Sequence, residues 1–185
     1  MIPERAGEYH HPAVNTMDTR ILDAALDAVA AGSATMDDIA ARAGVGRVTL
    51  FRRFGSKEGL LQRLYHREVA RFLTEVDAAL MDIDDPAERV AEAFAACVRA
   101  GAGHPLVARL RRGEALEYLA AGDPSPLELG RRFVAERLDP GQEHVADLLV
   151  RLAMTYVLVP SPDVDVTEAR SARAFARRML APLVA

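Results

Sequence analysis

The sequence predicts an all-α protein of about nine helices. Apolar residues recur at spacings of three and four along most of the 185-residue chain, which is the period of a helix with one buried face. No segment alternates between apolar and polar residues for long enough to form a sheet. Proline is favoured at the first position of a helix, and it follows a capping residue at Asp85-Pro86, His104-Pro105, Ser125-Pro126 and Asp139-Pro140.

The N-terminal region divides into an arm and a first helix. Residues 1–16 contain two prolines and little periodicity, so we expect a flexible arm, or a segment that lies upstream of a true start at Met17. A helix is predicted from about Met17 to Ala31. We expect residues 17–62 to form one domain of three helices and residues 63–185 to form a second, larger helical domain.

The stretch after this helix predicts two short helices joined by a tight turn. Thr35 followed by Asp38 is a capping box, which starts a helix. Gly44 ends that helix because glycine readily takes left-handed backbone angles, and Gly46 caps the next one. Such a pair is a helix-turn-helix, whose second helix is narrow enough to enter the major groove of DNA.

The second helix of the pair has two sides of different chemistry. We expect the apolar residues to face inward and the polar residues outward: Val48, Leu50, Phe51 and Phe54 on one side, Arg47, Thr49, Arg52 and Arg53 on the other. From Ile39 to Lys57 there are five basic residues and no acidic one, although the chain has a net charge of -4. Ser56 caps a third helix, whose free N–H groups form an anion site together with Lys57.

These features predict binding to double-stranded DNA, whose phosphates attract clustered positive charge. Charge alone leaves open an ordinary helical hairpin with a solvated basic face. Arg47 and Thr49 are our candidates for contacts to base edges. Arg52, Arg53 and Lys57 are our candidates for contacts to phosphates.

Residues 17–64 resemble the N-terminal domain of TetR-type transcriptional regulators. The resemblance rests on Gly44-Val45-Gly46, Thr49-Leu50-Phe51, Arg53-Phe54 and Ser56-Lys57-Glu58. Gly46, Phe51 and Arg53 depart from the serine, tyrosine and histidine that are usual in the family. The resemblance and the charge pattern together give the predicted DNA-contact positions: Thr35, Gly46, Arg47, Thr49, Phe51, Arg52, Arg53 and Lys57.

The resemblance also implies that the second domain holds a pocket for a small inducer. The helix after Ser56 has an apolar stripe more than twenty residues long and would connect the two domains. Candidate pocket residues are Tyr65, Phe72, Phe94, Cys97, Leu110, Tyr118, Phe133 and Met154. Any one of them is more often an ordinary core residue. Few charged residues fall on these faces, which favours an apolar or weakly polar ligand.

The last two predicted helices are apolar on more sides than a single chain needs to cover. The first runs from about residue 141 to 158, and the second begins near Asp165 with Glu168. A helix that is apolar on most sides must be buried on most sides. We therefore predict a homodimer through a four-helix interface, which is also the family's arrangement; a purely intramolecular core is the alternative. The predicted interface residues are Leu148, Leu149, Leu152, Tyr156, Phe175, Met179 and Leu183.

Other classes of function lack support in the sequence. No apolar run approaches the ~20 residues that span a bilayer, and no signal peptide is recognisable at the N-terminus, so we expect a cytoplasmic protein. Cys97 is the only cysteine and the five histidines show no metal-binding spacing, so we predict no metal and no cofactor. We find no Ser-His or Cys-His arrangement and no phosphate-binding loop, so we predict no catalytic residues and no enzyme.

The predicted function is a ligand-responsive transcriptional regulator, in the first instance a repressor. It would bind a palindromic operator as a homodimer and be released by a small, mostly apolar molecule. The alternative is a helix-turn-helix dimer that binds DNA constitutively and has no small-molecule ligand.

Overall fold

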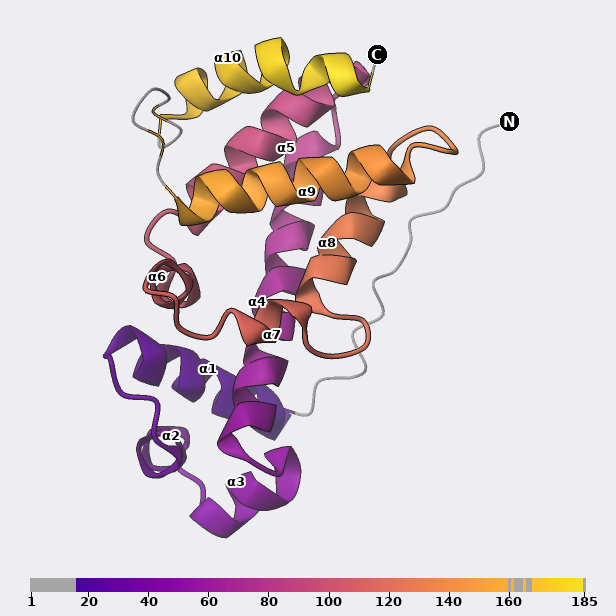
Figure 1. Cartoon of the computed structure of the whole chain (residues 1–185). Helices are drawn as coiled ribbons and strands as arrows, with labels where there is room; N and C mark the ends of the chain where they lie inside the picture. Colours follow the sequence, from indigo (N-terminus) through magenta and orange to yellow (C-terminus); the bar gives the residue numbers. More distant parts are fainter. Residues whose placement is uncertain (1–15, 160, 162–164, 166–167, 185) are drawn as a thin grey trace. The chain divides into compact units, whose positions relative to one another are not determined.

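The computed structural model describes residues 16–159, 161, 165 and 168–184 (Figure 1). Of the arm expected at residues 1–16, all but Thr16 lies outside the described residues. The described residues form ten α-helices and no strand, which confirms the all-α prediction. The helix beyond the expected nine is α7 (Glu117–Ala120), a single turn too short to show a period in the sequence. None of these helices combines the length and apolarity that a membrane span requires.

The chain divides into two compact units between Leu60 and Leu61. The described helices of the first unit are α1 (Thr16–Ala30), α2 (Met36–Ala43) and α3 (Arg47–Phe54). α4 (Lys57–Leu80) begins in the first unit and continues into the second as one helix of 24 residues. The core of the first unit comes from α1, α2 and α3, where Ile21, Ile39 and Leu50 have no exposed surface.

Capping contacts fix the helix ends in the first unit, as the sequence predicts. The Asp38 N–H donates to Thr35 Oγ1 over 3.1 Å, and Gly44 closes α2 with left-handed angles of φ 61° and ψ 38°. The Gly59 N–H donates to Ser56 Oγ over 3.1 Å and thereby caps α4. These caps satisfy backbone groups that have no partner within their own helix.

The orientation of α3 differs from the prediction at two of its apolar residues. Leu50 and Phe54 are buried, but Val48 is 80% exposed and Phe51 is 37% exposed. Leu50 and Phe54 lie one turn apart on the same side of α3, and this side packs against the core. Val48 lies two residues from Leu50 and therefore on the opposite side. The prediction that Val48 and Phe51 face inward is wrong, whereas Thr49 is half-buried.

The second unit contains most of α4 and all of the helices that follow it. After α4 follow α5 (Pro86–Gly101), α6 (Pro105–Arg111), α7, α8 (Pro126–Ala135), α9 (Glu143–Leu158), α10 (Ala169–Met179) and a 3₁₀ turn, η1 (Ala181–Leu183). Three of the predicted proline starts are confirmed, at α5, α6 and α8. At the first and last of them, Asp85 accepts from the Glu88 N–H and Ser125 accepts from the Glu128 N–H.

Two predicted helix starts in the second unit are wrong. Pro140 does not open a helix; the Gln142 side chain accepts from the Asp139 N–H over 3.3 Å and holds a turn, so that α9 begins at Glu143. α10 begins at Ala169, with Glu168 as its N-cap, and not near Asp165. Asp165 therefore lies outside the helix, four residues before its first residue.

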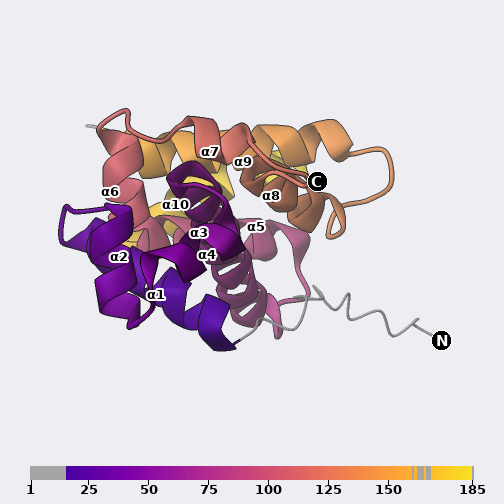
Figure 2. The same ribbon diagram turned by 90° about the horizontal axis from the view of Figure 1, so that it is seen from below.

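α9 and α10 both pack against α5 (Figures 1 and 2). Small residues let α5 and α10 approach closely: Ala91 and Ala95 face Ala172 and Ala176 in one buried cluster. An aromatic group joins all three helices, because Tyr156 lies with its ring centroid 5.7 Å from that of Phe94 and 4.9 Å from that of Phe175. A second cluster contains Leu73, Val76 and Leu80 of α4, Ala96 of α5 and Phe133 of α8.

We predict that Gly59→Ala destabilises the corner between α3 and α4. A Cβ atom at this position would overlap the backbone carbonyl oxygen of Phe54, which cannot rotate away. Overpacking of this kind costs about 1–3 kcal/mol, so the midpoint of urea unfolding followed by circular dichroism should fall. Gly46→Ser is the control, because a Cβ atom there meets nothing within 4 Å and serine is a good N-cap. An unchanged midpoint for Gly59→Ala would contradict the tight corner.

Candidate functional site

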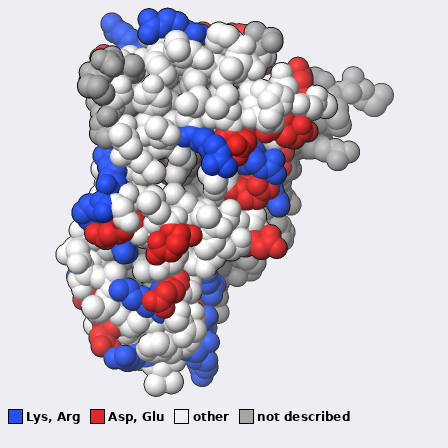
Figure 3. All heavy atoms as spheres, viewed as in Figure 1, with Lys and Arg blue, Asp and Glu red and all other residues white. Residues whose placement is uncertain are grey.

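The outward side of α3 and the start of α4 form an exposed, basic surface in the first unit. We call this the α3 surface and define it by Arg47, Val48, Phe51, Arg52 and Lys57. The first four are exposed and Lys57 is half-buried. Figure 3 shows Lys and Arg side chains gathered around the end of the unit that is drawn at the bottom.

Arg47 is held in place by two neighbours within the unit. Its Nη1 donates to both carboxylate oxygens of Asp37, over 2.7 and 2.8 Å. Its guanidinium carbon lies 5.4 Å from the centre of the Phe51 ring. Both Arg47 and Asp37 are largely exposed, and an exposed ion pair contributes little to stability. Arg47 can therefore exchange Asp37 for a hydrogen-bond acceptor on a ligand at low cost.

Arg53 has a different environment from the other predicted phosphate contacts. Its Nη1 donates to Asp18 Oδ1 over 2.5 Å, and both side chains are partly buried. This ion pair joins α3 to α1 across 35 positions of the sequence. Arg53 therefore forms an ion pair within the unit, and the Asp18 carboxylate already compensates its charge.

Arg52 and Lys57 carry the uncompensated charge of the α3 surface. Neither forms an ion pair with any of the residues that the structure describes. Lys57 is the first residue of α4, where free N–H groups attract anions. The backbone N–H of Glu58, followed by the Ser56 hydroxyl, holds the pKa of the Glu58 carboxyl below its ordinary value. Lys57 is therefore a candidate phosphate contact that lies next to a carboxylate.

The other predicted contact positions flank this surface. Gly46 is exposed at the start of α3, and Thr35 lies at the start of α2 with its hydroxyl engaged as a cap. Asp37 and Val48 were not predicted as site residues. Val48 was expected to face the core and so was not a candidate. Asp37 contacts Arg47 across ten positions of the sequence, which spacing alone does not indicate.

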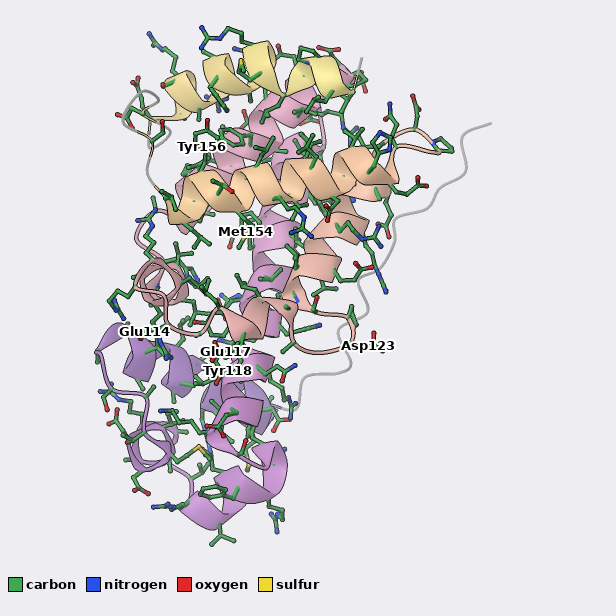
Figure 4. All side chains as sticks on the ribbon, viewed as in Figure 1. Glu114, Glu117, Tyr118, Asp123, Met154 and Tyr156 are labelled. Atoms are coloured by element: carbon green, nitrogen blue, oxygen red, sulfur yellow. The ribbon has the colours of Figure 1, made fainter. Side chains whose placement is uncertain are left out.

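The second unit contains an apolar cavity of about 200 Å³. Its walls come from α4, α5, α8 and α9, with Leu119 from α7 and with Leu180 and Val184 from the C-terminal end of the chain. Met154 and Tyr156 lie on opposite sides of α9 (Figure 4): Met154 lines the cavity, whereas Tyr156 packs in the aromatic group with Phe94 and Phe175. A cavity of this chemistry suits a ligand without many polar groups.

The structure brings five of the eight predicted pocket residues together around this cavity and places three elsewhere. The five are Phe72, Phe94, Cys97, Phe133 and Met154. Tyr65 and Tyr118 are absent from the lining because they stack on each other, with ring centroids 5.3 Å apart. Burial raises the pKa of Tyr65 to about 12. Leu110 is buried on α6, away from the lining.

Two arginines, Arg89 of α5 and Arg137, which follows α8, also line the cavity and were not predicted. The signal in the sequence was weak, because arginine is common in this chain and both positions read as ordinary polar faces. Among the described residues, no group of histidine, cysteine, aspartate and glutamate could hold a metal ion.

The predicted dimer residues differ in how much surface they offer to a partner. Leu148 is 43% exposed and Met179 is 54% exposed. Leu152, Tyr156, Phe175 and Leu183 are partly buried against the core of their own chain. Leu149 is buried and lines the cavity, so it has little surface left for a second chain, and the structure places it in the core.

Comparison with known proteins matches the chain to a family of bacterial regulatory proteins. The family model described as bacterial regulatory proteins, tetR family, matches residues 21–64. An HTH-type transcriptional regulator of Mycobacterium tuberculosis strain H37Rv, described as uncharacterised, is 30% identical over 153 residues, which cover 69% of this chain and 75% of that protein. The HTH-type transcriptional regulator AlkX of the same strain is 29% identical over 144 residues, which cover 71% of this chain and 68% of the relative.

Solved structures share the fold. The TetR family repressor AlkX from Dietzia sp. strain DQ12-45-1b, implicated in biodegradation of n-alkanes, superposes with a TM-score of 0.64 at 20% identity, over 90% of this chain and 94% of that chain. A TetR-family regulator from Streptomyces coelicolor superposes with a TM-score of 0.63 at 15% identity, over 95% and 98% of the two chains. At these identities the likeness concerns the fold alone.

We predict that Cys97 is unreactive in the folded protein. Burial raises the pKa of its thiol to about 12, and the thiolate is the reactive form. Iodoacetamide labelling at pH 8, followed by mass spectrometry, should therefore be slow in buffer and fast in denaturing urea. Cys97 is the only cysteine, so the mass shift reports on this position alone. Cys97 is only partly buried and lines the cavity, so rapid, complete labelling of the folded protein would contradict the raised pKa of its thiol.

Proposed function

The chain belongs to the TetR family of bacterial regulatory proteins and is a DNA-binding transcriptional regulator, and we propose that it is a repressor released by a small apolar ligand. It would act in the cytoplasm as a homodimer on a palindromic operator. The observation that carries the DNA-binding part is the α3 surface, where exposed Arg47 lies beside the uncompensated charges of Arg52 and Lys57.

The residues of the α3 surface suggest separate roles in DNA binding. Arg47 would leave Asp37 and donate to a guanine, a contact that discriminates between bases by about 1–3 kcal/mol. Val48, with its exposed apolar side chain, would contact a thymine methyl group beside it. Arg52 and Lys57 would contact phosphates, which sets affinity and salt dependence. Arg53 would support α3 through Asp18 and add less to phosphate binding than the sequence suggests.

The remaining predicted contact positions would have different roles. Gly46 at the start of α3 would let the backbone approach DNA closely, since no side chain intervenes. Phe51 would position Arg47 through the contact between its ring and the guanidinium. Thr35 would act through the start of α2, which its hydroxyl caps. Thr49 is half-buried and would reach a base only with the methyl or hydroxyl group of its side chain.

Dimerisation is supported by apolar surface on α9 and α10. Leu148 and Met179 are exposed although both belong to helices that otherwise contribute to the core. A symmetric dimer would present two α3 helices to successive major grooves, which lie about 34 Å apart. Under this proposal the interface comprises Leu148, Met179 and the partly exposed edges of Leu152, Tyr156, Phe175 and Leu183, without Leu149.

The cavity supports a ligand-responsive regulator over a constitutive one. A ligand that binds better to a dimer with a different α3 spacing shifts the population away from DNA, by no more than its preference between the two states. α4 is our candidate for the lever, because it carries Lys57 at its start and cavity-lining residues from Val69 to Leu80. The implication of the Dietzia repressor in n-alkane biodegradation is compatible with an apolar ligand here.

The experiment that tests the DNA-binding proposal is selection of bound duplexes from a random library. The native protein should enrich a palindrome, and a double variant with Arg47→Ala and Thr49→Ala should lose or relax it, because base contacts carry the specificity. No enrichment at low salt by the native protein would contradict the proposed role of the α3 surface.

We predict that Arg52→Ala and Lys57→Ala weaken binding to all sequences alike. Each change should reduce the slope of log affinity against log salt by about 0.9, the value for one lost phosphate contact. Fluorescence anisotropy of the selected duplex between low and moderate salt measures the slope. Arg112→Ala is the matched control, since Arg112 is exposed in the second unit and already pairs with Glu114. A slope unchanged by both substitutions would remove these residues from the phosphate contacts.

We predict that Met179→Glu separates the dimer, because it places a charge in an apolar interface. Analytical ultracentrifugation at micromolar concentration should show a dimer for the native chain and a monomer for the variant. Met81→Glu is the control, because Met81 is 79% exposed in the turn after α4 and outside the proposed interface. A native chain that sediments as a monomer would contradict the proposal.

A further inference from the structure

The cavity of the second unit is long in one direction. On α4 it is lined by Val69, Leu73, Val76 and Leu80, with Phe72 between them. These positions span three turns of the helix, roughly 16 Å at the α-helical rise. α8 lines the cavity along its length as well, from Pro126 to Arg137 beyond its end. The shape therefore suits an extended ligand that lies along α4.

The two ends of the cavity differ in chemistry. One end is uncharged and contains Leu119, which adjoins the Tyr65–Tyr118 stack near the start of the lining stretch of α4. The other end contains Arg89 and Arg137, and we call it the arginine end. Arg137 bonds to Asp77 in the last turns of α4, and Arg89 bonds to the carbonyl oxygen of Ile83 just beyond α4.

Each nitrogen of the Arg137 guanidinium donates a bond within the chain. Its Nε and Nη2 donate to Asp77 Oδ1 over 3.2 and 2.5 Å, and its Nη1 donates to the Phe133 carbonyl oxygen over 2.7 Å. Its guanidinium carbon also lies 3.7 Å from the centre of the Phe133 ring. Arg137 therefore builds the wall of the arginine end and offers little to a ligand.

Arg89 is in the opposite situation. The one hydrogen bond that its side chain makes with a described residue is the long contact of 3.4 Å to the Ile83 carbonyl oxygen, and none of the described carboxylates pairs with it. The nearest acids along α5 have other partners: Asp85 accepts from the Glu88 N–H, and Glu88 accepts two bonds from Arg177. A guanidinium with unused donors beside an apolar cavity favours a planar anion, which it binds through two parallel hydrogen bonds.

We propose that the cavity binds an aliphatic carboxylate, with its chain along α4 and its carboxylate on Arg89. This inference rests on the proposed function, because it names the ligand class of the cavity through which the regulator would respond. The apolar walls bind the chain, and the arginine end sets its direction. An alcohol of the same length fills the walls but offers Arg89 one uncharged acceptor in place of a two-oxygen anion.

Isothermal titration of the full chain with three ten-carbon probes tests this inference: decanoate, decanol and decyltrimethylammonium, each below the concentration at which it forms micelles. Decanoate should bind at least tenfold more tightly than decanol, and the ammonium compound should bind most weakly. Arg89→Gln should lower the affinity for decanoate to that for decanol, whereas Arg89→Lys should keep part of the preference for decanoate. Arg132→Gln should behave like the native chain, because Arg132 is exposed on α8 outside the cavity.

Each alternative outcome has a definite meaning. Equal affinities for decanoate and decanol in the native chain, or a preference that survives Arg89→Gln in a variant with native circular dichroism, would overturn the carboxylate assignment while leaving an apolar ligand in place. No binding of any probe would overturn the carboxylate assignment and the proposal of an apolar ligand together.

Discussion

The continuity of α4 is the constraint on which the proposed regulation depends. It runs from Lys57 to Leu80 without a proline, and its one glycine, Gly59, lies in the first turn. Backbone hydrogen bonds link each turn to the next, so the helix behaves as a rigid element that a packed neighbour can displace but not easily bend. One end carries Lys57, the proposed phosphate contact, and the other lines the cavity, so under this proposal a ligand that shifts α4 would act on the DNA-binding unit.

Internal ion pairs determine how much of the basic charge is available to DNA. The sequence has five basic residues between Ile39 and Lys57, but three of them pair with aspartates of α1 and α2. The exposed Arg47–Asp37 pair costs little to break and keeps Arg47 ordered before DNA arrives. Arg53, which is more buried, is better understood as part of the fold. The unpaired charges of Arg52 and Lys57 then dominate the salt dependence that we expect.

The sequence predicts what depends on near neighbours and misses what depends on distant ones. Caps such as Thr35 and three of four proline starts were predictable because the contacts span three residues. Which residues of α3 face the core could not be predicted, because eight residues make too few helical turns to show a clear apolar period. Nor could spacing show that Arg137 meets Asp77, 60 positions away. The large cavity residues were predictable as apolar positions, whereas Arg89 looked like an ordinary surface arginine.

The measurement that tests the account most directly is release of DNA by a cavity ligand. Fluorescence anisotropy would follow a labelled operator duplex while decanoate is added to the native chain and to Ala153→Phe, whose new ring would fill the cavity that Ala153 lines. We expect decanoate to release DNA from the native chain and to leave the affinity of the variant, whatever its starting value, unchanged. Equal release from both proteins, or none from the native chain with any ligand that fills the cavity, would contradict control of DNA binding through this cavity.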